Sequence, residues 1–423
     1  MLSRPRGPFD VFLLTVLLVS SMGAMGSCGS DSESGRVISV PGDAATIQEA
    51  VDRAESGDLV LIEAGTYHES VVVDTPRITI RGVDRNQVVL DGRYELPNGF
   101  EVTSDGVAVE NLTVHSFRQN GVIVSGAYRR AADDSIPVGT TGNSIAGFRV
   151  SYVTAYNNGL YGVYSFAAQD GLIENVYASG HPDSGIYVGQ CKPCNTVVKS
   201  IVAENNAIGY YGTNASGNVW VVESVFRGNR LGVAPNSQST EKLAPQEDAV
   251  IAGNLVVDND NADAPEIRMG FFSGGIVVGA GTRNTIVRNR VSGHSWAGIA
   301  VMPMNSYEPA GNRVVENVMT GNGVDLVYVG SAPDGDGNCF SDNTFLSSVP
   351  DSIEESLSCS NPLGLARPSE IELEPTVPGP DYRTIPVPSA QPSMPDARTA
   401  PRTIADGPPT YPNMEDIVVP DDR

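Results

Sequence analysis

The sequence predicts an all-β protein: a right-handed parallel β-helix, a single-stranded solenoid of about ten coils with a short amino-terminal capping helix and a Pro-rich carboxy-terminal tail. Three observations predict it. Glycine is abundant, at 45 of 423 residues, while only 18% of residues are charged. A glycine-centred pattern recurs at a near-constant interval. Short alternating strands between Gly and Asn turns leave no room for a helix in each repeat.

The repeat is a small residue or aliphatic, then Gly, then an aliphatic or aromatic residue. Four of its six successive intervals are 23 or 24 residues; the members are Gly121, Gly162, Gly185, Gly209, Gly232, Gly275 and Gly298. A second series of strands leads to an Asn or His beside a turn: Asn120, Asn158, His181, Asn206, Asn229, His294 and Asn322. Asn tolerates the positive φ that a sharp turn needs. The residues one and three after each Gly are expected to face inward, and the residue between them outward.

The two ends of residues 38–360 differ from the repeat. Residues 46–55 begin with Thr46 and Glu49, a capping box, and carry apolar side chains at helical spacing, so a helix is expected to plug the amino-terminal end. Strands are expected at 58–62 and 70–73. Beyond residue 360 prolines concentrate and the turn signals vanish, so 361–423 is expected to be extended and irregular, with part of it lying along the β-helix.

Residues 1–28 resemble a bacterial lipoprotein signal peptide. Arg4 and Arg6 precede an apolar run at 11–19, and Met25-Gly26-Ser27-Cys28 follows. The resemblance implies lipidation of Cys28, a flexible tether over 29–37, and a protein anchored outside the cytoplasm through its lipid only. Plain secretion is the alternative. In an oxidising compartment Cys191 with Cys194, and Cys339 with Cys359, are expected to form disulfides; a redox or metal role for the CxxC is the alternative.

The formal net charge of -23 argues against a nucleic-acid partner, which needs clustered cations. It also disfavours unaided binding of acidic polysaccharides.

The residues of the first coil and of two later repeats resemble a known superfamily. ATIQEAVDRAESGDLVLIEAGTYHE (45–69), HPDSGIYVGQ (181–190) and GNLVVDND (253–260) are similar to right-handed parallel β-helix proteins of the pectin-lyase-like fold, among them bacterial β-helix lipoproteins. The resemblance covers 38 to about 345 and implies the fold. It leaves the chemistry open, since the superfamily includes lyases, hydrolases, epimerases, esterases, adhesins and a NosD-like copper-enzyme maturation family. The lyase and galacturonan-hydrolase motifs are absent.

Two sets of side chains are candidates for a site. His181 and Asp183, near Gln190, could form an acid/base pair, or Asp183 could serve only the turn. Tyr164, Tyr187 and Tyr211 each stand two after their Gly, so they should project from one face, with Tyr161 nearby. Such rings stack on sugars or on one another. Trp296, beside His294, is a further candidate for stacking on a sugar.

No cofactor is expected. Two acidic loops, 258–263 (with Asp258, Asp260 and Asp263) and 334–338 (with Asp334 and Asp336), are candidates for Ca²⁺, although neither has the complete ligand set of a calcium loop. Four dispersed His and no Met cluster argue against copper.

Three functions follow as hypotheses. The leading one is a lipid-anchored β-helix that binds an extended polysaccharide along the tyrosine face, with modification of that polysaccharide as an extension of the same hypothesis. The others are a non-catalytic scaffold for protein partners and a polysaccharide lyase, hydrolase or epimerase. Substrate identity and oligomeric state are not encoded in any motif.

Overall fold

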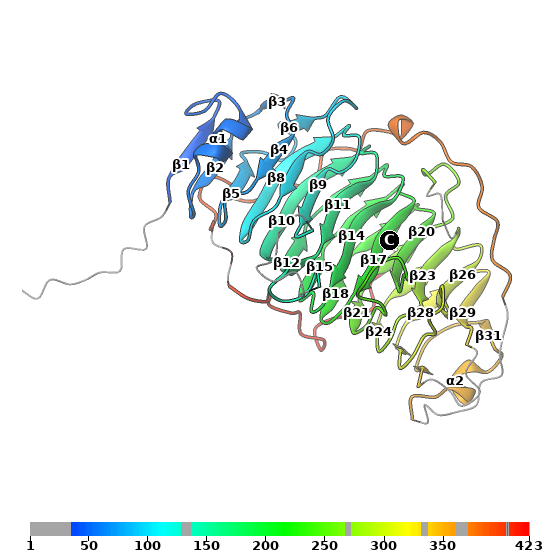
Figure 1. Ribbon diagram of the computed structural model, residues 1–423. Helices are drawn as coiled ribbons and strands as arrows, with labels where there is room; N and C mark the ends of the chain where they lie inside the picture. Colours follow the sequence, from blue (N-terminus) through cyan, green and yellow to red (C-terminus); the bar gives the residue numbers. More distant parts are fainter. Residues whose placement is uncertain are drawn as a thin grey trace, which may run out of the picture. The chain divides into compact units, whose positions relative to one another are not determined.

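The computed structural model describes residues 35–127, 137–266, 272–330, 337–360, 371–402, 404 and 406–422. In it, parallel strands stack coil upon coil in three rows, so the predicted parallel β-helix is confirmed (Figure 1). None of the helices in these residues is long and apolar enough to cross a membrane.

The third row is an eleven-stranded parallel sheet that carries the tyrosine positions. Its strands are β4 (Val71–Val73), β7 (Phe100–Val102), β9 (Val122–Ser125), β11 (Tyr161–Phe166), β14 (Ser184–Cys191), β17 (Ile208–Ala215), β20 (Leu231–Asn236), β23 (Gly274–Gly279), β26 (Ala297–Met302), β29 (Val324–Tyr328) and β31 (Ser348–Val349). The recurring glycines lie at or just before the first residues of successive strands of this sheet. A Cβ on Gly162 would approach the carbonyl oxygen of Gly185 to 2.5 Å, and one on Gly209 that of Gly232 to 2.6 Å. Close stacking of coils therefore explains the glycine repeat.

The first and second rows are joined by two long strands, β8 (Val107–His115) and β10 (Ile145–Tyr156), which bend at Asn111 and Tyr152 with positive φ. The other strands of the first row are β1 (Val37–Val40), β2 (Leu59–Ile62), β5 (Thr79–Gly82), β12 (Ala168–Glu174), β15 (Thr196–Lys199), β18 (Val219–Val222), β21 (Ala249–Ala252), β24 (Thr285–Val287), β27 (Arg313–Val315) and β30 (Cys339–Ser341). The other strands of the second row are β3 (Gly65–Tyr67), β6 (Val88–Asp91), β13 (Tyr177–Ser179), β16 (Val202–Glu204), β19 (Val225–Arg227), β22 (Leu255–Val257), β25 (Arg290–Ser292) and β28 (Val318–Thr320).

The interior is a column of apolar side chains, one layer from each coil. Ile186, Val188, Ile276 and Val278 all belong to one buried cluster, as the alternation within the strands requires. At the amino-terminal end, α1 (Ile47–Arg53) is capped by Thr46, whose side chain accepts a hydrogen bond from the Glu49 N–H. The helix buries its apolar face against β1, β2 and β4. The β-helix itself starts at Val37, one residue before the expected boundary.

Buried amides form a ladder at each of the three corners of a coil, where Asn side chains of neighbouring coils bond to one another. The longest, hereafter the long ladder, lies between the second and third rows and consists of Asn158, His181, Asn206, Asn229, Asn259, His294 and Asn322. A second includes Asn254, Asn289, Asn317 and Asn343, and a third Asn284, Asn312 and Asn338. These bonds satisfy polar groups that the turns bury.

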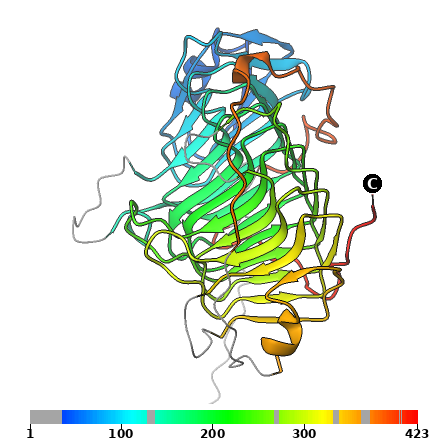
Figure 2. The same ribbon diagram turned by 90° about the vertical axis from the view of Figure 1, so that its right-hand side faces the viewer.

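The tail follows the β-helix in two legs (Figures 1 and 2). The first leg, 371–402, passes from Trp296 by way of Arg230 and Asn157 to Arg81 near the amino-terminal end. The second leg, 404 and 406–422, returns past Arg77 to Arg288 and Arg290. Among the described residues of the tail, the only helical turn is η1 (Tyr382–Thr384), in the first leg. The helix α2 (Ile353–Ser356) precedes the tail, at the carboxy-terminal end of the β-helix.

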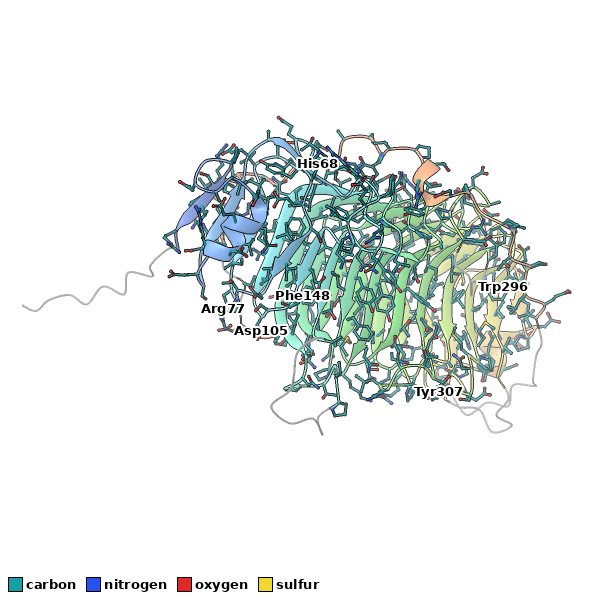
Figure 3. All side chains as sticks on the ribbon, turned by 45° about the horizontal axis from the view of Figure 1, so that its top comes forward. His68, Arg77, Asp105, Phe148, Trp296 and Tyr307 are labelled. Carbon is teal, nitrogen blue, oxygen red and sulfur yellow. A yellow bond between two sulfur atoms is a disulfide. The ribbon has the colours of Figure 1, made fainter. Side chains whose placement is uncertain are left out.

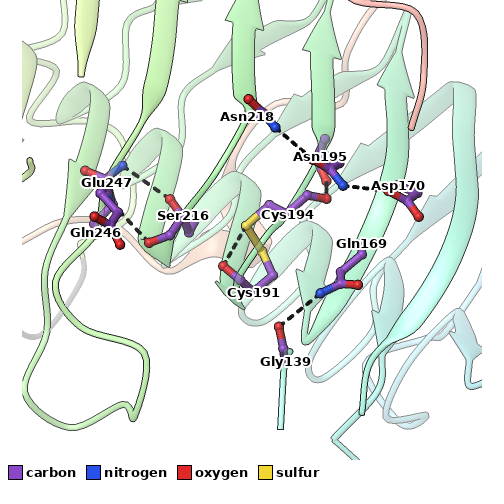
Figure 4. The surroundings of a disulfide bond; sticks show 12 residues. Gly139, Gln169, Asp170, Cys191, Cys194, Asn195, Ser216, Asn218, Gln246 and Glu247 are labelled. Carbon is purple, nitrogen blue, oxygen red and sulfur yellow. Dashed lines mark hydrogen bonds between the residues drawn. A yellow bond between two sulfur atoms is a disulfide. The ribbon is translucent and has the colours of Figure 1, made fainter. Parts of the chain in front are cut away.

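The structure contains both expected disulfides. Cys191 and Cys194 are joined with an S–S distance of 2.05 Å, and Cys339 and Cys359 with 2.16 Å. The first bridge lies at the corner between the third and first rows, beside a chain of amides in which Asn218 donates to Asn195 and Asn195 to Asp170 (Figure 4). Both of its cysteines are buried in the core.

Candidate functional site

Four tyrosines on three adjacent strands form a compact group, hereafter the tyrosine cluster: Tyr161, Tyr164, Tyr187 and Tyr211. Parallel register places Tyr164 beside Tyr187 and Tyr187 beside Tyr211. The ring centroids of Tyr164 and Tyr187 are 4.7 Å apart, and those of Tyr161 and Tyr164 4.5 Å. Tyr211 meets Tyr187 edge-on at 6.0 Å. The sequence therefore predicted the shared face, and the rings also stack on one another.

An insertion between β20 and β21 closes over one side of the cluster. The hydroxyl of Tyr187 donates to Glu241 Oε1 over 3.0 Å, and Gln238 Nε2 donates to the hydroxyl of Tyr211 over 2.7 Å. Tyr187 is consequently only 3% exposed, whereas Tyr161, Tyr164 and Tyr211 are half-buried. Glu241 and Gln238 are not predictable from the sequence, because nothing in the insertion indicates where it folds back.

Asp183 is the second carboxyl of the site and immediately precedes β14. Within the described residues no group donates a hydrogen bond to its buried Oδ1. Burial raises the pKa of this carboxyl to about 7, although hydroxyls of Tyr161 and Ser184 act in the opposite direction. Burial likewise raises the pKa of Glu241. The cluster therefore joins aromatic rings to two carboxyls that hold protons unusually well.

His181 lies inside the long ladder. Its Nδ1 is 2.7 Å from Asn206 Oδ1, and its Nε2 is 3.3 Å from Asn158 Nδ2. The ring thus continues the amide ladder as a neutral donor and acceptor. Burial lowers its pKa to about 4, and the same holds for His294 between Asn259 and Asn322. Both ring nitrogens of His181 are already engaged, so the geometry gives an acid/base pair with Asp183 no support.

Two further sequence candidates are held by the protein itself. The Gln190 side chain donates to the Val138 carbonyl and accepts from the Leu243 N–H, so it secures two loops. Trp296 (Figure 3) is 5% exposed, and its Nε1 donates to the Glu372 carbonyl of the tail. Three strand spacings of about 4.8 Å separate the Trp296 coil from β17, so Trp296 stands apart from the tyrosine cluster.

The ladder histidines give a prediction for stability against pH. Their folded pKa of about 4 lies below the value of about 6.5 of an unfolded histidine, so only the unfolded chain takes up protons as pH falls between these values. For each of the two histidines, the protein should therefore lose about 3 kcal/mol of its free energy of unfolding as pH falls through this window. We expect the His181→Asn, His294→Asn double variant, which keeps amide rungs, to lose less stability than wild type in urea unfolding between pH 7 and 4. Parallel curves for the two proteins would contradict the assignment.

The candidate metal loops do not assemble a site in the part of the chain that the structure describes, where no three His, Cys, Asp or Glu side chains are grouped to hold an ion. In the first acidic loop Asn259 is a ladder rung. In the second, Asp334 and Asp336 lie outside the described residues, as does Cys28.

The two remaining histidines flank Asp91 on successive coils. His68 Nδ1 is 3.9 Å from Asp91 Oδ2, and His115 Nδ1 is 3.7 Å from Asp91 Oδ1. Their nitrogens already face other groups: His68 Nδ1 the Asp91 carbonyl, His68 Nε2 the Arg93 guanidinium, and His115 Nδ1 the Ser116 hydroxyl. Both nitrogens of His68 are therefore engaged, and His115 offers one imidazole at its Nε2. A single imidazole, with no group of three His, Cys, Asp or Glu able to hold an ion among the described residues, does not fit a copper centre.

Comparison with known proteins adds a family and a fold. A family model described as "Periplasmic copper-binding protein (NosD)" matches residues 98–356. The A-module of mannuronan C-5 epimerase AlgE6 from Azotobacter vinelandii has a TM-score of 0.50 at 14% identity, over 71% of this chain and 90% of its own. Pectate lyase Pel9A has a TM-score of 0.41 at 14% identity, over 90% and 94%. The periplasmic alginate epimerase AlgG has a TM-score of 0.42 at 10% identity, over 69% of this chain and 76% of its own. At such identities the likeness shows the fold alone. No curated protein matches this chain.

Proposed function

This chain belongs to the periplasmic NosD family, and we propose that it works outside the cytoplasm as a β-helix that binds polysaccharide at the tyrosine cluster. The observation that carries the proposal is the cluster itself, in which aromatic faces adjoin the carboxyls of Asp183 and Glu241. Aromatic rings pack against the apolar faces of sugars, and carboxyls bond their hydroxyls. We also propose, from the sequence, that Cys28 carries a lipid anchor. The test is fatty-acid labelling, which wild type should show and a Cys28→Ser variant should lose.

Copper does not enter this proposal despite the family's description. The two ladder histidines and His68 have both ring nitrogens engaged, so His115 is left with one imidazole nitrogen, Nε2. Copper favours unprotonated imidazole with a free lone pair. The polysaccharide-directed names of the structural neighbours bear on the fold only.

Binding should depend on the half-buried rings. We expect the Tyr164→Ala, Tyr211→Ala double variant to bind polysaccharide about tenfold more weakly, because two aromatic contacts are each worth about 0.5–1.5 kcal/mol. Affinity electrophoresis and calorimetry on a polysaccharide panel measure it. Tyr187 is left in place because its ring is buried and serves the fold.

The matched control for this prediction is Tyr307→Ala, since Tyr307 is half-buried on a loop that follows β26. It should bind as wild type does. Unchanged affinity of the double variant, with its circular dichroism intact, would place polysaccharide elsewhere. A wild-type protein that binds no polysaccharide but co-purifies with an envelope protein would favour the scaffold function instead.

A further inference from the structure

We propose that the tyrosine cluster takes a neutral glycan and rejects polyuronates, because the groups that border its rings are acidic and, among the described residues, neither of these carboxyls is paired with a Lys or Arg. This inference rests on the proposed function and names the substrate class of the same site. A neutral glycan differs from mannuronan, pectate and alginate, the polymers that appear in the names of the structural neighbours.

Charge around the cluster has one sign. Asp183 lies beside Tyr161, and Glu241 accepts from Tyr187. In the part of the chain that the structure describes, neither carboxyl forms an ion pair with Lys or Arg, and no guanidinium stacks on a cluster ring. A bound uronate would add a third carboxylate to a partly buried site, where repulsion is screened least. The net charge of -23 adds long-range repulsion of any polyanion.

The hydrogen-bonding groups of the site match hydroxyls. Asp183 Oδ1 and the neighbouring Ser184 Oγ are both buried, and neither makes a hydrogen bond of good geometry among the described residues, although the hydroxyls of Tyr161 and Ser184 lie close enough to lower the pKa of Asp183. An unpartnered buried polar atom is costly, and a ligand hydroxyl would satisfy it. Glu241 has its two oxygens facing Tyr187 and Asn214, so it is fixed beside the rings.

Protonation agrees with this geometry. Burial raises the pKa of both carboxyls, and no cation contributes to either shift. Near pH 7 Asp183 exists as a mixture of neutral acid and carboxylate, so it can donate to one sugar hydroxyl or accept from it. A carboxylate ligand would push these pKa values higher still and would bind only as protons are taken up.

The test is a binding panel at pH 7 and fixed ionic strength. Xylan, galactomannan and a mixed-linkage glucan are the neutral probes, and alginate and polygalacturonate the acidic ones. We expect wild type to bind at least one neutral polymer about tenfold more tightly than either polyuronate. Glu241→Gln, which removes the charge and keeps an acceptor for Tyr187, should raise the ratio of polyuronate affinity to neutral-polymer affinity several-fold.

The control variant is Asp263→Asn, an exposed acid outside the cluster, which should change neither affinity. Polyuronate bound as tightly as neutral polymer by wild type, or a ratio of affinities left unchanged by Glu241→Gln, would overturn the inference while leaving polysaccharide binding intact. Binding to neither class would overturn the proposed function as well. Neutral binding that survives the Tyr164→Ala, Tyr211→Ala change would refute the site for both.

Discussion

Replacing Asn229 by Ala should lower the free energy of unfolding by about 3–5 kcal/mol. The Asn229 side chain accepts from both the backbone N–H and the Nδ2 of Asn206, and donates to Asn259 Oδ1 and the Ala203 carbonyl. Alanine leaves these groups buried and unsatisfied, and each such group costs about 1–3 kcal/mol. Because the ladder is continuous, the loss should spread to adjacent coils.

Urea unfolding followed by circular dichroism measures this loss, and hydrogen exchange locates it. Amides of Asn206 and its neighbours should exchange faster. The control is Asn218→Ala, since the exposed Asn218 side chain also bonds a neighbouring coil, at Asn195 of the preceding one, and its loss should cost about 1 kcal/mol. Equal effects of the two substitutions would show that the ladder does not stabilise the coils.

Arg81→Ala should be similarly damaging and should release the tail. Arg81 is fully buried, with 0% exposure, and its Nε donates to the equally buried Glu110 over 2.7 Å. Its Nη1 and Nη2 donate to the tail carbonyls of Ala397, Ala400 and Pro401. Removing one partner of a buried ion pair costs up to about 3–5 kcal/mol. Because Arg149 still pairs with the other oxygen of Glu110, we expect a loss near the lower end of this range.

Thermal unfolding should show the loss of stability, and hydrogen exchange over 397–402 should rise at temperatures where the β-helix is intact. Arg77→Ala is the matched control: Arg77 pairs with Asp406 of the same tail, but both are exposed, so less than about 1 kcal/mol is expected. If Arg81→Ala does not fold, Arg81→Lys keeps the charge with fewer donors and should give an intermediate loss. If hydrogen exchange over 397–402 is the same as in wild type for both Arg81→Ala and Arg81→Lys, the tail is held by its other contacts.

The strongest sequence signals came from positions where one physical requirement repeats in every coil. The spacing of Gly162, Gly185, Gly209 and Gly232 marked the coils, because a Cβ there meets the carbonyl of the next coil. Asn and His beside the turns marked a corner, although their role as a continuous ladder emerged only in the structure. Thr46 with Glu49 located the capping helix, because capping is a contact between near neighbours.

The site was only half visible from the chain. Tyr164, Tyr187 and Tyr211 share a register position, so their common face followed from the repeat. Glu241 and Gln238 arrive from an insertion, and the contacts they make span up to 54 residues with no period to announce them. The burial of Trp296 beneath the tail was not predictable for the same reason, since the tail has no repeat that would place it against the β-helix.

By itself the sequence determined the parallel β-helix, its coil length, its capped amino-terminal end and the tyrosine face, since all of these arise from local turns or from a fixed repeat. Only the tertiary structure decided that His181 is a ladder rung, that acidic groups border the rings, and that the tail is bound along its length by arginines. Those features are contacts between segments of unrelated sequence, and their partners are set by where long insertions and the tail come to rest on the completed coils.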